Sequence, residues 1–318
     1  MIKKIGVLTS GGDAPGMNAA IRAVVRTAIQ KGIEVYGIHD GFLGMYEGRI
    51  ERLYRKSVSE KLGRGGTFLG TARLQEFTKP EVRQIAVDNL AIYGIDAVVA
   101  IGGDGTYQGA LALSEMGIHT VGVPGTIDND ISGTDFTIGF DTALNTVVEA
   151  VDKLRDTSNS HRRCSIIEVM GRNCGDIAVW TAIAVGAEFV VSKETGFDLQ
   201  AILDNVTKAA QAKSHAIIIV AENMVDVNWL AKEVSEKTPF EARATILGHI
   251  QRGGVPTAKD RVLASEMGYK AVEALLDDET GVCVCQRNNK IITVPIKEAL
   301  GDDIPPVLEK YKVFKDLW

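Results

Sequence analysis

Apolar runs alternate along the chain with longer segments in which apolar residues recur every three or four positions. The runs at 5–9, 97–101 and 120–123 are short and rich in Val or Ile, which is typical of buried parallel strands. The segment that ends at Lys31 is predicted to be a helix, because its apolar residues share one face. That face consists of Ile21, Val24, Val25, Ala28 and Ile29.

Two more helices are predicted from the same periodicity. Residues 78–81 (Thr-Lys-Pro-Glu) predict a capping box with a proline in the first turn of a helix. The apolar face of this helix would consist of Val82, Ile85, Ala86 and Leu90. A helix from about Asp141 has an apolar face of Leu144, Val147, Val148, Val151 and Leu154. Further strands are predicted at 165–169, 215–221 and 243–247. This alternation predicts an α/β fold with parallel sheets covered by helices on both faces.

A glycine-containing turn follows several of the predicted strands. These turns are Gly11-Gly12-Asp13, Gly102-Gly103-Asp104, Met170-Gly171-Arg172 and Gln251-Arg252-Gly253-Gly254. Ligands of open α/β sheets bind beyond the carboxyl ends of the strands, so we expect the turns to converge on one cleft between two lobes.

Length, charge and cysteine spacing exclude several classes of protein. The 318 residues are enough for about two domains, and the formal net charge of −6 argues against a binder of nucleic acid or membrane surfaces. The four cysteines lack C-x-x-C spacing, which favours reduced thiols of a cytoplasmic protein over zinc ligands or disulfides. The longest nearly apolar stretch, between Asp176 and Glu188, is shorter than the roughly 20 residues of a membrane span.

The run Gly102-Gly103-Asp104-Gly105-Thr106 lies between the strand at 97–101 and a predicted helix at 107–116, and it indicates a phosphate site. Glycines between a buried strand and a helix let backbone N–H groups approach a phosphate, and Asp104 offers a hard oxygen to Mg²⁺. Such turns are also common for steric reasons alone, which leaves the two readings of this motif equally open. A second glycine turn at Gly11-Gly12 favours the phosphate site.

The second informative run is Pro124-Gly125-Thr126-Ile127-Asp128-Asn129-Asp130. In an extended chain Asp128 and Asp130 would point the same way, which suits proton abstraction beside a metal. Asp and Asn are also favoured in ordinary turns.

Arginines at strand ends or beside glycines favour an anionic substrate, because a guanidinium holds phosphate oxygens bidentately. They are Arg73, Arg163, Arg172, Arg243 and Arg252, and His249 lies near the last of them. Each one alone is more often a solvated surface charge. Arg22 and Arg26 lie opposite the apolar face of the first helix, where arginines normally contribute only to solubility.

In these motifs and their order the chain closely resembles the ATP-dependent 6-phosphofructokinases of bacteria, from Ile5 to about Asn288. The specific stretches are residues 102–105 (Gly-Gly-Asp-Gly), 124–130 (Pro-Gly-Thr-Ile-Asp-Asn-Asp), 168–172 (Glu-Val-Met-Gly-Arg) and 247–254 (Leu-Gly-His-Ile-Gln-Arg-Gly-Gly). The resemblance implies two Rossmann-like lobes with the active site in the cleft between them. Residues 1–139 and 253–303 would form the larger, ATP-binding lobe, and 140–252 and 304–318 the smaller, sugar-phosphate-binding lobe.

The resemblance also implies the reaction, transfer of the γ-phosphoryl group of MgATP to the C1 hydroxyl of fructose 6-phosphate. Asp128 would be the base, with Thr126 and Asp130 positioning the phosphoryl group and the sugar or metal. Asp104 would hold Mg²⁺. The ATP site would comprise Gly12, Arg73, Leu74, Gly103, Asp104, Gly105 and Thr106. Arg73 and Arg172, with Gly12, would meet the charge on the transferring group.

The resemblance implies more residues for the sugar-phosphate site than for the ATP site. The residues of the sugar-phosphate site would be Thr126, Ile127, Asp128, Arg163, Met170, Gly171, Arg172, Glu222, Arg243, His249, Ile250, Gln251 and Arg252. Arg163 and Arg243 would reach in from a neighbouring subunit of a homotetramer.

A second nucleotide site, where ADP activates and phosphoenolpyruvate inhibits, is implied as well. Its residues would be Arg22, Arg26, Arg55, Arg155, Gly186, Glu188, Lys213 and His215, which changes the reading of Arg22 and Arg26. Gln211 and Lys56 depart from the family pattern of a lysine and an aromatic residue, so we expect weakened effector binding.

Three alternatives are weighed against this reading. Pyrophosphate-dependent relatives carry Asp and Lys in place of Gly105 and Gly125, so both glycines favour ATP. NAD and lipid kinases share the Gly-Gly-Asp-Gly-Thr run but lack the other stretches. A catalytically silent nucleotide sensor would not need Asp104, Asp128 and Arg172.

Overall fold

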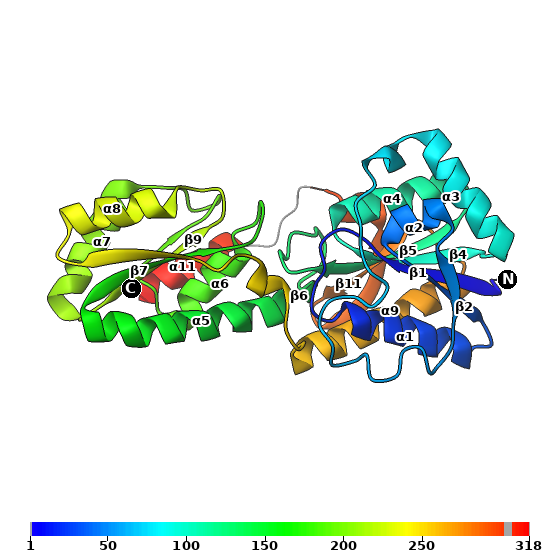
Figure 1. Cartoon of the computed structure of the whole chain (residues 1–318), viewed down its shortest axis with the longest axis horizontal. Helices are drawn as coiled ribbons and strands as arrows, with labels where there is room; N and C mark the ends of the chain where they lie inside the picture. The colour runs from blue at the N-terminus through cyan, green and yellow to red at the C-terminus, as the bar shows by residue number, and fades with distance from the viewer. Residues whose placement is uncertain (1, 302–306, 318) are drawn as a thin grey trace. The chain divides into compact units, whose positions relative to one another are not determined.

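The structure is a computed structural model and describes residues 2–301 and 307–317, which fold into two compact units (Figure 1). The first unit contains the chain up to Ile127, Ile131–Thr142 and the segment that starts at Arg252. The second contains Asp128–Asp130, Ala143–Gln251 and the C-terminal helix. The predicted change of lobe at residues 303 and 304 lies outside the described residues.

The first unit is built on an eight-stranded sheet in the order β12-β11-β5-β4-β1-β2-β3, with β6 paired to β5. The strands are β1 (Lys4–Thr9), β2 (Glu34–Ile38), β3 (Ile50–Leu53), β4 (Ala97–Gly102), β5 (His119–Thr126), β6 (Ile138–Gly139), β11 (Val282–Arg287) and β12 (Lys290–Pro295). The central pairs are parallel, and only β3 and β12 run antiparallel to their neighbours. The apolar runs that predict parallel strands at 5–9, 97–101 and 120–123 are therefore confirmed.

Helices cover both faces of this sheet (Figure 1). The two that pack against each other on one face are α1 (Met17–Gln30) and α9 (Ala258–Leu276). The other face carries α2 (Gly41–Glu47), η1 (Gln75–Thr78), α3 (Pro80–Tyr93), α4 (Asp104–Glu115) and α10 (Ile296–Ala299). Their apolar side chains enclose a core in which Leu90, Tyr107 and Leu113 are fully buried.

The second unit has a parallel four-stranded sheet in the order β10-β7-β9-β8. Its strands are β7 (Arg163–Val169), β8 (Phe189–Val191), β9 (Ala216–Ala221) and β10 (Glu241–Ile246). Its helices are α5 (Phe140–His161), α6 (Asp176–Val185), α7 (Leu199–Ala212), α8 (Val227–Lys237) and α11 (Val307–Leu317), and the short η2 (Gly248–Arg252) follows β10. In Figure 1 α7 and α8 lie on one side of the sheet and α5 and α6 on the other.

The structure corrects three expectations. Thr78 ends η1, and the N-cap of α3 is Lys79 without a side-chain capping bond, so the capping box is not formed, although Pro80 does open α3. Ile85 is 44% exposed and does not join the apolar face of that helix. Asn129 has a φ of 53°, so Asp128 and Asp130 lie in a turn and not in extended chain.

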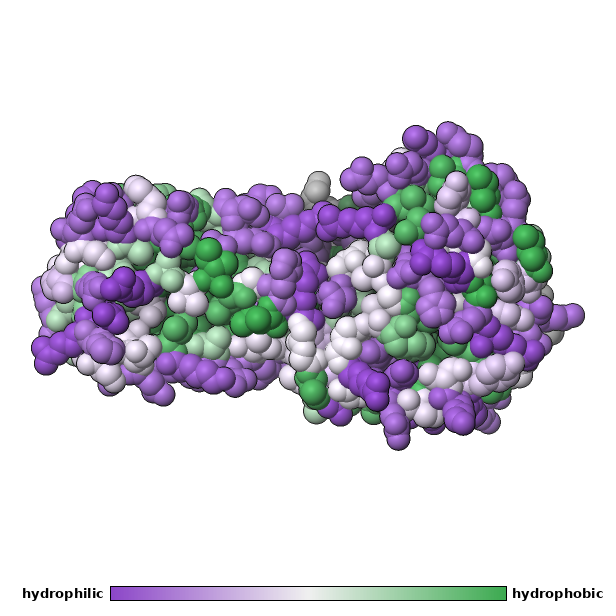
Figure 2. All heavy atoms as spheres, in the orientation of Figure 1, coloured by the Kyte–Doolittle hydropathy of each residue, from purple (hydrophilic) through white to green (hydrophobic). Residues whose placement is uncertain are grey.

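Hydrophilic residues cover most of the face seen in Figure 2. In the described part of the chain, none of the helices combines the length and the apolar character that a membrane crossing requires. The four cysteines are buried free thiols.

Candidate active site

The first unit brings its two glycine turns together. β1 and β4 are parallel neighbours with Thr9 opposite Ile101, so the turns that follow them start at the same edge of the sheet. The Ser10 amide donates to the Ile101 carbonyl at 3.1 Å, and the buried Thr106 hydroxyl donates to the Ser10 carbonyl at 3.0 Å. A Cβ on Gly102 would stand 2.4 Å from that same carbonyl oxygen, so only glycine fits there.

The helix α4 starts within the Gly102–Thr106 turn, earlier than the sequence predicted. Gly103 is its N-cap and Asp104 its first residue, and the Gly103 carbonyl accepts from the amides of Thr106 and Tyr107 at 2.9 and 3.1 Å. The next residue, Gly105, is exposed, and a Cβ built on it would meet no atom within 4 Å. The positive end of a helix and the open space beside Gly105 together suit a phosphate chain.

Magnesium fits this turn on the chemistry of its donors. Asp104 offers one half-buried carboxylate at the helix start. Among residues 2–301 and 307–317 there is no group of three or more acidic, His or Cys side chains that would hold a metal alone. Mg²⁺ in phosphoryl-transfer sites is bound through one or two carboxylates together with substrate phosphates and water. The donor set therefore fits a cation that enters with a nucleotide.

The loop before η1 is tied to the first glycine turn. The Thr71 hydroxyl donates to the Gly11 carbonyl at 2.7 Å, and Thr9 hydrogen-bonds to both Thr67 and the Gly70 carbonyl. These bonds hold the chain that leads to Arg73, whose side chain is exposed. Leu74 follows and packs against the core.

Arg252 lies against the same turn in the first unit. Its Nη1 donates to the Asp13 carbonyl at 3.4 Å, and a Cβ on Gly12 would stand only 2.1 Å from that nitrogen. The resemblance implied a sugar-phosphate contact for Arg252 and an ATP contact for Gly12. The structure brings the two residues together.

The segment Thr126–Asp130, which we call the acid loop, begins at the last residue of β5. Thr126 ends the strand and its carbonyl accepts a bond from Thr137 at 2.7 Å, while Ile127 is fully buried. Asp128 and Asn129 are buried as well, at 7% and 2% exposed. Asp130 lies 3.9 Å from Nη1 of Arg172. The acid loop therefore places two carboxylates around a buried amide, beside a guanidinium.

Arg172 belongs to the turn after β7. Gly171 has a φ of 144° and Arg172 a φ of 55°, and both amides donate to one carboxylate oxygen of Glu222, at 3.2 and 2.7 Å. Glu222 thus fixes a left-handed turn that would otherwise be costly for arginine. Met170 before it is held by Gln251, which is fully buried and accepts from the Met170 amide at 3.1 Å.

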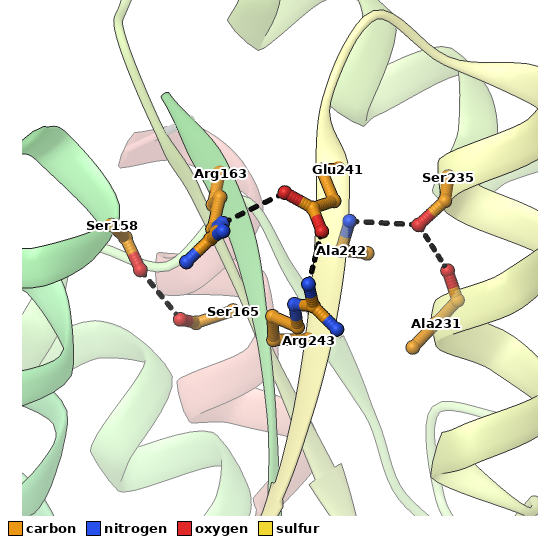
Figure 3. A network of polar contacts seen from close by, with 8 residues as sticks. All are labelled: Ser158, Arg163, Ser165, Ala231, Ser235, Glu241, Ala242 and Arg243. Carbon is orange, nitrogen blue, oxygen red and sulfur yellow. Dashed lines mark hydrogen bonds and ion pairs between the residues drawn. The ribbon is translucent and has the colours of Figure 1, made fainter. Parts of the chain in front are cut away.

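Two of the implied phosphate-binding arginines share one carboxylate. Arg163 Nε donates to Glu241 Oε2 at 2.9 Å, and Arg243 Nη2 bonds to Oε1 of the same residue (Figure 3). The bond from Arg163 is the main reason that the pKa of Glu241 lies below its usual value. The structure thus brings Arg163 and Arg243 together. Glu241 was not among the residues predicted from the sequence, although it stands two residues from Arg243 in a strand and therefore shares its face.

The remaining implied substrate residues, His249 and Ile250, lie in η2 and are exposed. The implied effector residues fall into two groups. Arg22, Arg26 and Arg55 lie in the first unit, and the others lie in the second.

In the second unit the effector group is compact. Arg155 approaches the His215 Nε2 at 3.3 Å and bonds to the carbonyl of Val185, directly before Gly186. Lys213 donates to the buried Glu188 at 2.7 Å. Burial, more than the neighbouring cations, lowers the pKa of His215, so the neutral form of its ring is favoured. In the first unit, burial and the charge of Arg26 lower the pKa of Arg22.

Known proteins match the chain over its whole length. The sequence profile of the phosphofructokinase family matches residues 4–275. Proteins named ATP-dependent 6-phosphofructokinase from Aliivibrio fischeri and Vibrio parahaemolyticus are each 56% identical over 320 residues, covering 100% of both chains.

Solved structures agree in fold. The phosphofructokinase of Saccharomyces cerevisiae superposes with a TM-score of 0.90 at 36% identity, over 98% of this chain, which spans half the length of the yeast chain. A pyrophosphate-dependent phosphofructokinase from Marinobacter aquaeolei superposes over 99% of this chain and 91% of its own with a TM-score of 0.86, at 19% identity. The chain is α/β with mostly parallel sheets flanked by helices, and it belongs to the phosphofructokinase family.

Proposed function

We propose that this enzyme transfers the γ-phosphoryl group of ATP to the C1 hydroxyl of fructose 6-phosphate, a committed step of glycolysis. The observation that carries the proposal is full-length identity of 56% to proteins named for this ATP-dependent activity. The glycine turns and the acid loop supply residues suited to each half of the reaction.

The first unit would bind the donor. The amides of Gly103 and Gly105, with Thr106 and Gly12, would line the phosphates, next to Arg73 and Leu74. Asp104 would hold Mg²⁺, which supplies charge neutralisation at the β- and γ-phosphates. The exposed guanidinium of Arg73 would then meet the charge on the transferring group.

The acid loop would activate the acceptor. Asp128 would take the proton of the C1 hydroxyl, and Thr126 and Asp130 would position the reacting groups. Arg172, 3.9 Å from Asp130, would stabilise the charge that develops on the phosphoryl oxygens.

The sugar phosphate would lie among the residues that the resemblance implies for it, two of which would act indirectly. Met170, Gly171, Glu222 and His249 would contact the sugar, while Ile250 and Arg252 would contribute at its edge. Gln251 and Ile127 are fully buried, so we give their side chains the role of holding neighbouring backbone.

ATP rather than pyrophosphate is the proposed donor. No atom lies within 4 Å of a Cβ built on Gly105, and this space would take a nucleotide phosphate. An assay coupled to aldolase, with fructose 6-phosphate and either donor, tests this directly. We expect turnover with ATP and none with pyrophosphate, and similar kcat/KM values for the two donors would refute the proposal.

We further propose a homotetramer in which Arg163 and Arg243 complete the site of a neighbouring subunit. β10 is an edge strand of its sheet, and Ile246 on it and Ile250 just after it are exposed. An edge strand with exposed apolar residues suits contact with a second copy.

Mixed oligomers test the shared site. Asp128→Ala and Arg163→Ala chains, unfolded and refolded together, should regain a sizeable fraction of activity, because one site then carries both defects and another neither. Asp128→Ala mixed with Arg172→Ala is the matched control and should recover nothing, since both residues would serve the same site. Failure of the first pair in confirmed mixed oligomers would refute the shared site.

ADP and phosphoenolpyruvate are the proposed effectors, with weakened binding because Gln211 and Lys56 lack family contacts. Gln211→Lys should tighten ADP binding by about tenfold in titration calorimetry, the worth of one screened charge-assisted bond. Gln200→Lys, on the same helix α7, adds the same charge elsewhere and should change nothing. Equal effects of the two variants would contradict the assignment.

The cytoplasm is the proposed compartment. Four free thiols persist most readily in a reducing environment. A fractionation of cells that express the protein checks this.

A further inference from the structure

Asp128, Asn129 and Asp130 belong by their contacts to the second unit, whereas the chain up to Ile127 and from Ile131 belongs to the first. Such a short segment has no secondary structure of its own to hold it. One of the contacts that hold it in the second unit is a buried hydrogen bond of the Asn129 side chain.

The Asn129 amide nitrogen donates to Oδ2 of Asp176 at 2.6 Å. Both side chains are 2% exposed, and the Asn129 carbonyl lies 4.0 Å from the Cys174 sulfur. Asn129 also has a left-handed φ of 53°, a conformation that asparagine tolerates better than most residues. The residue between the two carboxylates is thus fixed by its backbone and by its side chain.

The segment that carries Asp176 is itself braced. The amide of Gly175 donates to Oε1 of Glu194 at 3.0 Å, and the Ser192 hydroxyl donates to Oε2 at 2.7 Å. A Cβ on Gly175 would stand 2.3 Å from Glu194, so these groups are closely packed. Further along α6, the Nζ atom of Lys310 in α11 lies 4.0 Å from the ring centre of Trp180.

Asp176 does not act as an ordinary capping residue. The N-cap of α6 is Gly175, without a side-chain bond, whereas Asp198 caps α7 by accepting from the Ala201 amide. Burial raises the pKa of Asp176 to about 6, and the bond from Asn129 opposes that rise. A carboxyl group that is costly to bury is kept here in contact with the acid loop.

We propose that Asp176 is a positioning residue for phosphoryl transfer, which holds Asp128 and Asp130 in place through its buried hydrogen bond to Asn129. This inference rests on the proposed role of Asp128 as the base. Asp176 touches no reacting atom in this role. Misplacement of catalytic groups by about 1 Å can cost about 10²-fold in rate, so loss of the bond acts on kcat.

The test compares four variants in the ATP and fructose 6-phosphate assay. Asp176→Ala removes the acceptor and Asn129→Gly removes the donor while keeping the backbone conformation. Each should lower kcat by about 10-fold to 10²-fold, with KM for ATP within about threefold. The double variant should be no worse than the poorer single variant, because both remove the same bond. Asp176→Asn keeps an acceptor oxygen and should retain kcat within about threefold.

Asp198→Ala is the matched control, since it removes another aspartate from the start of a helix in the same unit and should leave kcat unchanged. The proposal is overturned if Asp176→Ala and Asn129→Gly keep kcat within about threefold, if their losses multiply in the double variant, or if Asp176→Asn is as poor as Asp176→Ala. Asn129→Gly decides alone if Asp176→Ala does not fold. Asp128→Ala separates the role of Asp128 as the base from the positioning role of Asp176. If Asp128→Ala keeps its kcat, Asp128 is not the base. If Asp128→Ala loses kcat while Asp176→Ala and Asn129→Gly keep theirs, Asp176 is not a positioning residue.

Discussion

The glycine turn at Gly102–Thr106 is held by hydrogen bonds to backbone carbonyls at the edge of one sheet, whereas Asn129 and Asp130 of the acid loop contact other side chains. Ser10 and Thr106 close the turn within the edge of one sheet. The side-chain amide of Asn129 donates to the side-chain carboxylate of Asp176. The turn offers backbone donors that no side-chain change removes, while the acid loop depends on individual side chains. Donor binding and the chemical step should therefore respond to different substitutions.

Loss of the guanidinium beside the acid loop should have the largest effect on the chemical step. Arg172→Ala should lower kcat by about 10²-fold to 10³-fold, as expected when a group that stabilises transition-state charge is removed. Arg172→Lys should recover part of the loss, because it restores the charge without the bidentate geometry. Steady-state kinetics of both variants measure this. Equal kcat for Arg172→Ala and the unaltered enzyme would remove Arg172 from the site.

A charge placed in the glycine turn should affect the donor instead. Gly105→Asp fills the open space beside α4 with a carboxylate, which repels phosphate, so kcat/KM for ATP should fall by about 10²-fold. The melting temperature should change little, since no atom lies within 4 Å of the new Cβ. Gly105→Ala is the control for bulk alone. An unchanged KM for ATP in Gly105→Asp would place the nucleotide phosphates elsewhere.

A milder effect is expected where a side chain only braces the turn at Gly171 and Arg172. Glu222→Gln keeps an acceptor for the Gly171 and Arg172 amides but weakens both bonds, so KM for fructose 6-phosphate should rise by about tenfold and KM for ATP should not. Separate titration of each substrate in the coupled assay distinguishes the two. A rise in KM for ATP alone would contradict the assignment.

The smallest effect concerns pH and stability. The folded pKa of Asp176 is about 6, above the usual value near 4, so the folded state binds the proton more tightly than the unfolded state. The contribution of protonated Asp176 to the free energy of unfolding is therefore present at low pH and lost as pH rises through about 6. From pH 5 to pH 7 this loss is about 1 kcal/mol and is absent in Asp176→Asn. Thermal melts of both proteins at the two pH values measure it, and parallel changes would contradict the burial of a titrating group.

Much of the first unit could be predicted from the sequence, because its signals are local. The apolar runs at 97–101 and 120–123 predict the strands, and the glycines after the first run predict the turn. The start of α4 at Asp104 lies earlier than predicted, since apolar periodicity does not reveal a helix that opens on aspartate and glycine.

The acid loop could be predicted less well, because its geometry depends on residues far away in the sequence. Two aspartates two positions apart suggest extended chain, but the left-handed Asn129 and its bond to Asp176 set a turn instead. Nothing near Asp176 signals this contact, since the residue simply begins an apolar helix. Glu241 differs, as its two-residue spacing from Arg243 is a usable signal.

The measurement that tests the account most directly is the kcat of Asp128→Ala together with its dissociation constant for ATP from titration calorimetry. If the acid loop performs the chemical step and the glycine turn binds the donor, kcat should fall by at least about 10²-fold while the ATP dissociation constant stays within about threefold. A kcat within a few-fold of the unaltered enzyme, or a loss explained by weaker ATP binding, would contradict the account.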